Sequence, residues 1–371
     1  MTNMPMLRVL VVDDTIIYRK IVSDVLEEIP GVKVIGTAQN GKIALSMIEK
    51  LKPDLITLDV EMPEMNGLQV LEELKKRQID VGTIMVSTLT HRGAETTMKA
   101  LELGAFYFIP KPDSGTMEEN KKSIKNTIYP IINAFASKKR IRKILSKDGS
   151  FGASYTKAGK EPPKQKVVNV PGTARRAKNV KSEAVAIGVS TGGPNALAEV
   201  IPRLPQKLGV PVLIVQHMPP LFTECLAKNL DSKSNLKVVE AQDQMPVEVD
   251  TVYIAPGGKH MKITRAVGNG IKRIKITDDP PENNCKPSVD YLFRSIAHIY
   301  KNRATGVIMT GMGSDGTLGL KLMKRFGATI IAQNEETCVV FGMPKKPIEE
   351  GIADVVAPLD KIPDEIVKTL K

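Results

Sequence analysis

The 371-residue sequence contains no tryptophan, and aromatic residues make up only 4% of it. Single-stranded nucleic acids are commonly held by stacking their bases on aromatic side chains, so this scarcity argues against such a surface. No apolar run approaches the roughly 20 residues that a membrane-spanning helix needs. The N-terminus does not read as a secretory signal, because Asp13 and Asp14 follow residues 1–7 almost at once. We therefore expect a cytoplasmic protein without membrane insertion.

Cysteine and histidine are also scarce. The three cysteines, Cys225, Cys285 and Cys338, are odd in number and far apart, which favours free thiols over a disulfide framework or a metal cluster. There are only four histidines, so each candidate for acid–base chemistry can be judged singly: His91, His217, His260 and His298.

Most of the chain carries no excess of positive charge. Residues 138–181 hold fourteen Lys and Arg against Asp148 and Glu161, which accounts for the whole net charge of +12. This segment also contains prolines and glycines and lacks sustained hydrophobic periodicity, so it is predicted to be a flexible linker. Its charge favours solvation over recognition, and we expect no nucleic-acid partner. The predicted organisation is a domain at 1–136, the linker at 137–181 and a second domain at 182–371.

The first domain alternates apolar runs with helical patterns. Strands are predicted at 9–12, 32–35, 55–58, 84–86 and 106–109, and helices at 16–29, 42–51, 68–77, 94–103 and 118–136. Five such repeats indicate an α/β fold with a doubly wound parallel sheet. Polar residues follow the first, third, fourth and fifth strands, and they meet at one carboxyl edge: Asp13, Asp14, Asp59, Ser87, Thr88 and Lys111. Carboxylates crowded in this way favour a hard divalent cation, Mg²⁺, although an acidic loop cluster alone explains them too.

The second domain presents a hydroxyl where an apolar run meets glycines. Residues 184–189 form a run typical of a buried strand, and Ser190 follows in a G-x-S-x-G turn that suits either a nucleophile or a merely structural βα turn. His217 follows the apolar run 210–215, as a general base for Ser190 would, or as a core imidazole; His260 is its rival. Asp315 follows a third run, 305–309, as an orienting carboxylate or as the N-cap of the next helix. His298 lies in a helical pattern that is predicted to face the core.

Five motifs together resemble the CheB-type protein-glutamate methylesterases. They are IGVSTGGP at 187–194, VQHMP at 215–219, IAPG at 254–257 with His260-Met261, PSVDYLF at 287–293 and TGMGSDG at 310–316. The resemblance continues through 333–344, and the domain ahead resembles response-regulator receivers. It implies a flavodoxin-like receiver followed by an α/β methylesterase domain, joined by the basic linker.

The resemblance also implies roles for individual residues. Ser190, His217 and Asp315 map onto the family's catalytic residues, with Thr191, Met312 and His260 lining the site or the oxyanion environment. In the receiver, Asp59 maps onto the phosphoacceptor, and Ser87, Phe108 and Lys111 onto the switch and phosphate-contacting positions. Mg²⁺ is implied among Asp13, Asp14, Asp59 and Glu61, and no cofactor in the methylesterase domain. Lys111-Pro112 falls where receivers often have a cis peptide bond.

The implied activity is hydrolysis of glutamyl methyl esters on the cytoplasmic helices of chemoreceptors, with deamidation of receptor glutamines, in chemotactic adaptation. A histidine kinase is the implied phosphodonor, and we expect a monomer. A rival interpretation is a response regulator whose output is binding, through the linker to nucleic acid or through a degenerate hydrolase domain to a protein. No helix-turn-helix pattern is evident in the sequence.

Overall fold

A computed structural model describes residues 6–88, 90–112, 115–147, 168–169, 180–265 and 270–371. The chain forms two compact units, Met1–Gly152 and Ala153–Lys371, and each is described by itself. No helix in the described part of the chain combines the length and the apolar character needed to cross a membrane.

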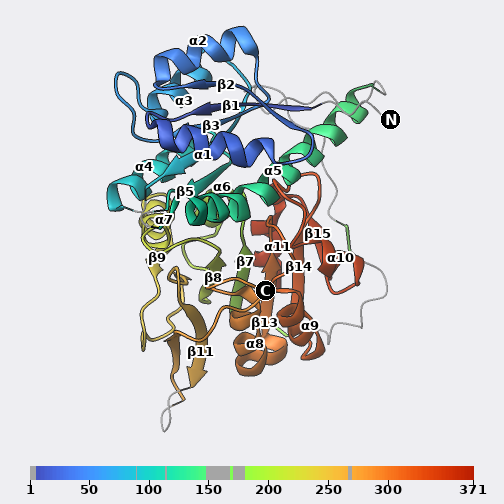
Figure 1. The fold of residues 1–371 in the computed structure, drawn as a ribbon. Helices are drawn as coiled ribbons and strands as arrows, with labels where there is room; N and C mark the ends of the chain where they lie inside the picture. Colours follow the sequence, from blue (N-terminus) through green and yellow to red (C-terminus); the bar gives the residue numbers. More distant parts are fainter. Residues whose placement is uncertain (1–5, 89, 113–114, 148–167, 170–179, 266–269) are drawn as a thin grey trace. The chain divides into compact units, whose positions relative to one another are not determined.

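The first unit is a five-stranded parallel sheet with helices on both sides (Figure 1). Its strands are β1 (Leu7–Val12), β2 (Val32–Ala38), β3 (Leu55–Asp59), β4 (Gly82–Ser87) and β5 (Tyr107–Pro110), in the order β2-β1-β3-β4-β5. Its helices are α1 (Ile16–Glu27), α2 (Gly41–Leu51), α3 (Gly67–Lys76), α4 (His91–Glu102) and α5 (Met117–Lys147). The strand order reverses direction after β2, so right-handed crossovers place α1 on one face and α2, α3 and α4 on the other. α5 packs against α1.

The predicted elements of this unit are confirmed within a few residues, with one difference at its end. The final helix was predicted to stop at 136, whereas α5 continues to Lys147. The two compact units divide after Gly152, inside the predicted linker. Charged residues in the last turns of a helix are compatible with helical backbone, so the rise in Lys and Arg after 137 did not mark the helix end.

The second unit is built on an eight-stranded sheet that is parallel except at one edge. Its strands are β6 (Val168–Asn169), β7 (Ala184–Val189), β8 (Val212–Gln216), β9 (Lys237–Glu240), β10 (Thr251–Ile254), β13 (Ala304–Ile308), β14 (Thr329–Gln333) and β15 (Val355–Ala357), in the order β6-β15-β14-β13-β7-β8-β10-β9. Only β6, which lies in the predicted linker, pairs antiparallel. β11 (His260–Arg265) and β12 (Lys272–Thr277) form a separate antiparallel hairpin (Figure 1).

The helices of this unit cover the sheet. They are α6 (Gly193–Val200), α7 (Phe222–Asp231), α8 (Val289–Tyr300), α9 (Thr317–Arg325), α10 (Lys345–Glu349) and α11 (Ile362–Thr369), with 3₁₀ turns at Ile201–Arg203, Lys301–Arg303 and Leu359–Lys361. α8 packs against α9 and against β11, and its apolar side chains belong to the main core. The predicted α/β fold with two doubly wound parallel sheets is confirmed.

The strand order decides where the site is formed. β7, β8 and β13 are buried along their whole lengths, as their apolar sequences predict for central strands of a parallel sheet. β7 lies between β13 and β8. Residues that follow these three strands therefore meet at one carboxyl edge.

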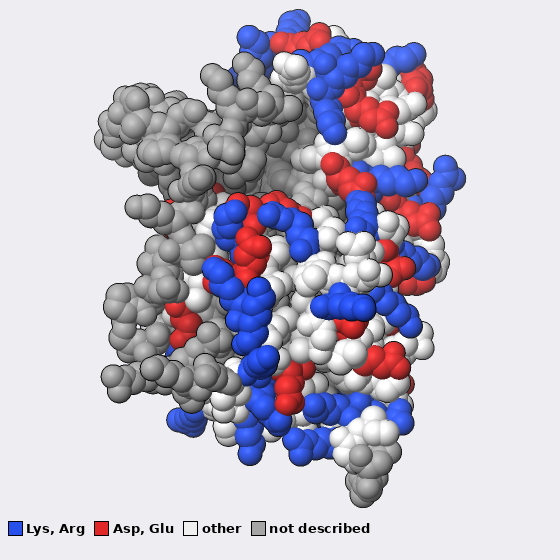
Figure 2. Space-filling model, turned by 180° about the vertical axis from the view of Figure 1, so that it is seen from behind, with Lys and Arg blue, Asp and Glu red and all other residues white. Residues whose placement is uncertain are grey.

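Charged side chains on the surface are mixed in sign. On the face shown in Figure 2, Lys and Arg groups lie beside Asp and Glu groups rather than forming one continuous basic area. Elsewhere on the helices, ion pairs such as Lys20–Asp24 and Lys228–Glu224 join an exposed lysine to a partly exposed carboxylate, and each such pair contributes little stability.

Candidate active site

Ser190 lies directly after β7, in the turn that leads into α6. Its backbone N–H donates to Thr310 O at 3.0 Å, and its carbonyl accepts from Gln216 Nε2 at 3.0 Å. The turn is completed by Gly192 at φ +77°, a conformation that suits glycine. Neighbours on both sides thus fix the Ser190 backbone, while the hydroxyl is not used as a structural hydrogen bond within the described residues.

His217 lies directly after β8, beside Ser190. Its backbone N–H donates to Val189 O at 3.2 Å, so the two residues sit at neighbouring strand ends. The imidazole Nε2 lies 2.9 Å from Asp315 Oδ2, and Nδ1 lies 3.7 Å from Cys285 Sγ. A carboxylate can only accept, so Asp315 selects the tautomer with the proton on Nε2 and leaves the lone pair on Nδ1.

Asp315 is a buried carboxylate surrounded by donors. Besides His217, it accepts from the backbone N–H groups of Val289 (2.7 Å), Asp290 (3.2 Å) and Gly316 (3.0 Å), from Ser288 Oγ (3.0 Å) and from Asn283 Nδ2 (2.8 Å). The predicted alternative, an N-cap of the helix that follows, is wrong. α9 has Gly316 as its N-cap residue, and Asp315 instead accepts from the first two N–H groups of α8, whose own N-cap residue is Ser288.

Electrostatics couple Asp315 and His217. Burial raises the pKa of Asp315, but the hydrogen bond and charge of His217 and the N–H of Val289 outweigh burial and hold that pKa well below its usual range. Burial lowers the pKa of His217, yet the hydrogen bond to Asp315 and the contact with Cys285 outweigh it, so this pKa lies above its usual range. The pair therefore favours a carboxylate that stabilises an imidazolium.

Two backbone N–H groups near Ser190 remain available. Within the described residues, the N–H groups of Thr191 and Met312 donate to no protein acceptor. Thr191 follows Ser190, and Met312 follows Gly311, whose position lies so close to the serine that an added Cβ would come 2.8 Å from Ser190 Cβ. Backbone N–H groups in such places can stabilise a developing oxyanion.

The structure separates the four histidines clearly. His260 is fully buried: its Nε2 lies 3.0 Å from Pro280 O, its Nδ1 accepts from Ser288 N at 3.2 Å, and its ring stacks on Tyr291. It is therefore a core imidazole that supports Ser288, one step removed from Asp315. His298 was predicted to face the core but is exposed, with its ring edge against Phe326. His91 is also exposed.

The structure does not bring every predicted partner into contact. Within the described residues, no hydrogen bond joins Ser190 Oγ to His217. Hydrogen bonds between catalytic groups are often long without substrate and shorten when substrate binds.

In the first unit, Asp13, Asp14 and Asp59 have oxygens within 4.8 Å of one another. Lys111 Nζ lies 2.8 Å from Asp13 Oδ2 and 2.7 Å from Asp59 Oδ2. Burial, with a smaller contribution from the charge of Asp13, raises the pKa of Asp59 to about 6 against the opposing effect of Lys111. The ammonium thus contacts two of the three clustered carboxylates, and the three carboxylates are a donor set that a hard divalent cation fits.

The other predicted residues of this edge lie as follows. Ser87 is fully buried with its Oγ 3.3 Å from Gly93 O, and Phe108 is buried on β5. Glu61 is exposed, with its carboxylate 3.7 Å from Arg92 Nε, and is not part of the carboxylate cluster. The cis peptide expected at Lys111-Pro112 is not found; among the described residues the cis bond is Lys286–Pro287.

Comparison with known proteins decides the family. The CheB methylesterase model matches residues 185–366, and the response regulator receiver domain model matches residues 9–121. A protein-glutamate methylesterase/protein-glutamine glutaminase of Desulfotalea psychrophila is 53% identical over 98% of this chain and 99% of its own. One of the same name from Bacillus subtilis is 42% identical over 99% of both chains. This chain belongs to the CheB methylesterase family.

Solved structures of Thermotoga maritima match the two parts of this methylesterase separately. The CheB methylesterase catalytic domain is 47% identical and covers 51% of this chain and 99% of its own, with a TM-score of 0.49. The response regulator domain of CheB is 40% identical and covers 33% of this chain and 93% of its own, with a TM-score of 0.30.

Several residues of this methylesterase site were not assigned a role from the sequence. Cys285 contacts His217, Asn283 and Ser288 hold Asp315, and Gln216 holds the Ser190 carbonyl. Ser288 and Gln216 lie inside the motifs that carried the resemblance, where Gln216 ends the apolar strand β8 and Ser288 starts α8, so their polarity was an available signal. Cys285 and Asn283 lie in an irregular segment whose direction no periodicity predicts.

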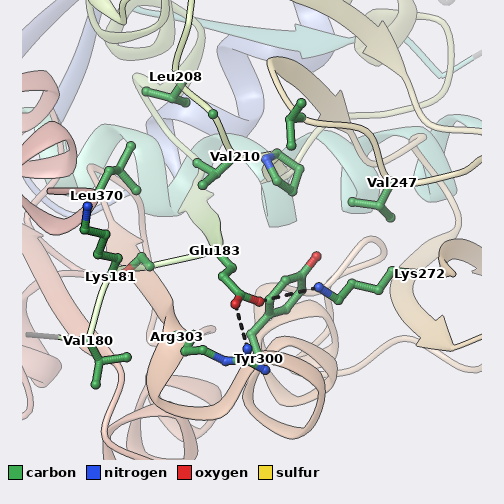
Figure 3. Close-up of a pocket in the computed structure, with 14 residues that line it drawn as sticks. Val180, Lys181, Glu183, Leu208, Val210, Val247, Lys272, Tyr300, Arg303 and Leu370 are labelled. Atoms are coloured by element: carbon green, nitrogen blue, oxygen red, sulfur yellow. Dashed lines mark hydrogen bonds and ion pairs between the residues drawn. The ribbon is translucent and has the colours of Figure 1, made fainter. Parts of the chain in front are cut away.

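A pocket of about 730 Å³ lies at the amino ends of the strands of the methylesterase sheet, opposite the edge that holds Ser190. Its lining includes residues that precede β7, β8 and β13, among them Glu183, Val210 and Arg303. Figure 3 shows the Glu183 carboxylate between Arg303 and Lys272. Its Oε1 lies 2.6 Å from Arg303 Nη1, and its Oε2 lies 3.7 Å from Lys272 Nζ. Ligands of open α/β sheets bind at the carboxyl ends of strands, so this pocket at the amino ends is not the active-site candidate.

Proposed function

We propose that this methylesterase hydrolyses glutamyl methyl esters on the cytoplasmic helices of chemoreceptors, releasing methanol, and deamidates receptor glutamines by the same acyl chemistry, in chemotactic adaptation. One observation carries the proposal. The Asp315–His217 pair lies at the strand end next to Ser190, on the carboxyl edge where, within the described residues, the N–H groups of Thr191 and Met312 have no protein acceptor.

Acylation begins with attack of Ser190 Oγ on the ester carbonyl carbon. The hydroxyl proton passes to Nδ1 of His217, because Asp315 keeps the other ring proton on Nε2. The N–H groups of Thr191 and Met312 stabilise the oxyanion of the tetrahedral intermediate. When the intermediate collapses, the imidazolium returns its proton to the departing methoxide oxygen, so methanol leaves and an acyl-serine remains.

Deacylation repeats these steps with water as the nucleophile. His217 accepts a proton from the attacking water, and the second intermediate collapses to free glutamate and the Ser190 hydroxyl, which recovers the proton from His217. A glutamine substrate follows the same path with ammonia as the first leaving group. Asp315 stays ionised throughout and stabilises each imidazolium.

The test measures methanol release from a methylated receptor by full-length Ser190→Ala and Ser314→Ala proteins. Ser314 is exposed and adjacent to Asp315, so its substitution is a matched control. We expect Ser190→Ala to lose hydrolysis and Ser314→Ala to keep it. Hydrolysis by Ser190→Ala within tenfold of the unmodified protein would contradict the proposal. Loss of hydrolysis on Cys285→Ala with retention on Ser190→Ala would make the thiol the nucleophile.

We further propose that Asp59 accepts a phosphoryl group from a histidine kinase in the cytoplasm and that phosphorylation raises the esterase rate. Mg²⁺ would be held by the carboxylates of Asp13, Asp14 and Asp59. When bound, the cation neutralises charge that develops on the phosphoryl oxygens. Lys111 lies against Asp59 and would contact the phosphoryl group, and Ser87 and Phe108 would respond to it.

The proposed regulation is relief of inhibition: the unphosphorylated receiver covers the esterase site, and phosphorylation shifts the population towards the uncovered state. Typical couplings of about 1–3 kcal/mol give roughly 5- to 150-fold activation. The test compares methanol release with and without a small-molecule phosphodonor for the unmodified protein and for Asp59→Asn. Equal stimulation of both proteins would exclude Asp59 as the regulatory site.

A further inference from the structure

Cys285 is positioned by a tight turn against the imidazole of His217. Glu282 and Cys285 exchange both backbone hydrogen bonds, at 3.1 and 2.9 Å, and the two residues between them, Asn283 and Asn284, have φ of +53° and +59°. This geometry is that of a two-residue turn with both central residues left-handed, a conformation that asparagine tolerates. The thiol is therefore held in place by the backbone.

Further contacts anchor the same turn. Glu282 pairs with Arg294 of α8, with Oε2 2.6 Å from Nη2, and the Asn283 amide donates to both Asp315 and Asp290. The turn is thus connected to α8 and to the carboxylate that orients His217. A group held on several sides keeps its geometry when a ligand arrives, so little ordering is needed for binding.

The ligand atoms of His217, Cys285 and Asp315 lie within 4.8 Å of one another. Asp315 occupies Nε2, so Nδ1 presents a lone pair towards Cys285 Sγ at 3.7 Å. Zn²⁺ bonds nitrogen at about 2.0–2.1 Å and sulfur at about 2.3 Å, so tetrahedral ligands would be roughly 3.5 Å apart. The observed Nδ1–Sγ distance of 3.7 Å is only about 0.2 Å longer than this, so a small side-chain shift would bring both atoms to bonding distance of one cation.

Asp315, the third residue of the cluster, provides the hydrogen-bond acceptor that a metal-bound histidine usually has. A ligating imidazole commonly donates its other N–H to a carboxylate, which fixes the tautomer and raises its basicity. Asp315 already accepts from Nε2 in this way. His217 is partly exposed, with 15% of its side-chain surface accessible, and Cys285 is partly buried, so a cation can enter and complete its coordination with water.

We propose that Cys285 Sγ and His217 Nδ1 bind Zn²⁺, or a similarly thiophilic divalent cation, and that this binding switches off hydrolysis. The thiol releases its proton to solvent as the sulfur–metal bond forms, and the imidazolium form of His217 likewise loses its Nδ1 proton to solvent, so that Nδ1 donates its lone pair with no change of oxidation state. The occupied Nδ1 can no longer accept the Ser190 proton. Metal binding stands on the geometry alone, whereas the inhibition rests on the proposed function.

The experiment uses full-length protein freed of metal by a chelator and kept with excess Mg²⁺, a hard cation that does not favour thiolate. Zn²⁺ affinity is measured by competition with a chromophoric chelator for the unmodified protein, Cys285→Ala and Cys225→Ala. Cys225 lies buried on α7 and serves as the matched thiol control. Circular dichroism establishes that each variant is folded. Co²⁺ provides a second readout, because a thiolate ligand gives a charge-transfer band in the near ultraviolet.

We expect Cys285→Ala to weaken Zn²⁺ binding at least tenfold, since loss of even an outer partner of a metal site costs about 10- to 100-fold. The Co²⁺ band should disappear in Cys285→Ala and persist in Cys225→Ala. Methanol release, compared with each variant's own metal-free rate, should be inhibited by Zn²⁺ in the unmodified protein and in Cys225→Ala at similar concentrations.

Equal Zn²⁺ affinity of Cys285→Ala and the unmodified protein, with the Co²⁺ band retained, would overturn the site. Binding that depends on Cys285 but leaves hydrolysis unchanged would overturn the inhibition. Binding that depends on Cys285 in a protein with no ester hydrolysis would leave the metal site standing and refute the proposed function instead.

Discussion

Replacing Asp315 with asparagine changes a single atom at the centre of six hydrogen bonds. Oδ2 accepts from His217 and Val289, whereas Oδ1 accepts from Ser288, Asn283, Asp290 and Gly316. An amide NH₂ cannot accept, so it conflicts with fewer donors when it takes the Oδ2 position. Asp315→Asn is therefore expected to turn its NH₂ towards His217.

This orientation removes the base. Facing a donor, the imidazole places its lone pair on Nε2 and its proton on Nδ1, and Nδ1 can then no longer take the Ser190 proton. We expect kcat to fall on the order of 10⁴-fold, the scale that applies when an orienting carboxylate is replaced and its histidine is held in the wrong tautomer. The free energy of unfolding should fall as well, because the Val289 N–H loses its acceptor and an unsatisfied buried donor costs about 1–3 kcal/mol.

The pH dependence of the remaining activity should shift together with this loss of kcat. Hydrolysis needs neutral His217, so the rate rises with pH as the imidazolium loses its proton. Asp315 raises the pKa of His217, so the midpoint of this rise should move to lower pH in Asp315→Asn. A purely structural role for Asp315 would not move that midpoint.

Asp290→Asn is the matched control, because Asp290 is a buried carboxylate that accepts from the same Asn283 amide and from Gly319 N, without touching His217. Methanol release is measured across pH for both variants, and melting temperature by calorimetry, where 1 kcal/mol corresponds to about 2–4 °C for a domain of this size. If kcat of Asp315→Asn fell no further than that of Asp290→Asn, the tautomer reasoning would be refuted.

Three further outcomes are expected. His217→Gln should abolish methanol release, whereas exposed His298→Gln should change activity and melting temperature little; equal losses of turnover in two folded proteins would argue against His217 as the base. Gln216→Leu removes the amide that holds the turn after β7 and should lower kcat about 10- to 100-fold with KM nearly constant, as misplaced reacting groups do; a change confined to KM would contradict a positioning role. Lys111→Met removes the ammonium that lowers the pKa of Asp59, so its phosphorylation by a small phosphodonor should require higher pH, as measured by acyl-phosphate formation; an unshifted pH dependence would show that Lys111 does not tune Asp59.

Sequence patterns predicted the central strands and the residues that end them, because a strand buried on both faces must be apolar throughout and its first polar residue marks its edge. Ser190, His217 and Asp59 were placed in this way. The pattern was less informative for His298, which lies in sequence among the buried apolar residues of α8. The His298 side chain is itself exposed, and its ring contacts Phe326 by its edge.

The surroundings of Asp315 could not be predicted from local sequence. Its cap on α8 joins residues that are 25 and 26 positions apart, and Asp290 of α8 returns a contact to Gly319 of α9. Reciprocal capping of this kind depends on how the two helices pack. A capping propensity at one helix start identifies a suitable side chain without showing which helix it will serve.

This reciprocal capping also determines which substitutions change catalysis without changing stability. Asp315 orients His217 and at the same time satisfies the first turn of α8, so its loss combines a catalytic and a structural cost. Ser190 is held by its backbone N–H and carbonyl, and its side chain carries no hydrogen bond within the described residues. Removing the Ser190 hydroxyl therefore leaves the supports of the turn in place, and a loss of hydrolysis at that position reports on the nucleophile alone.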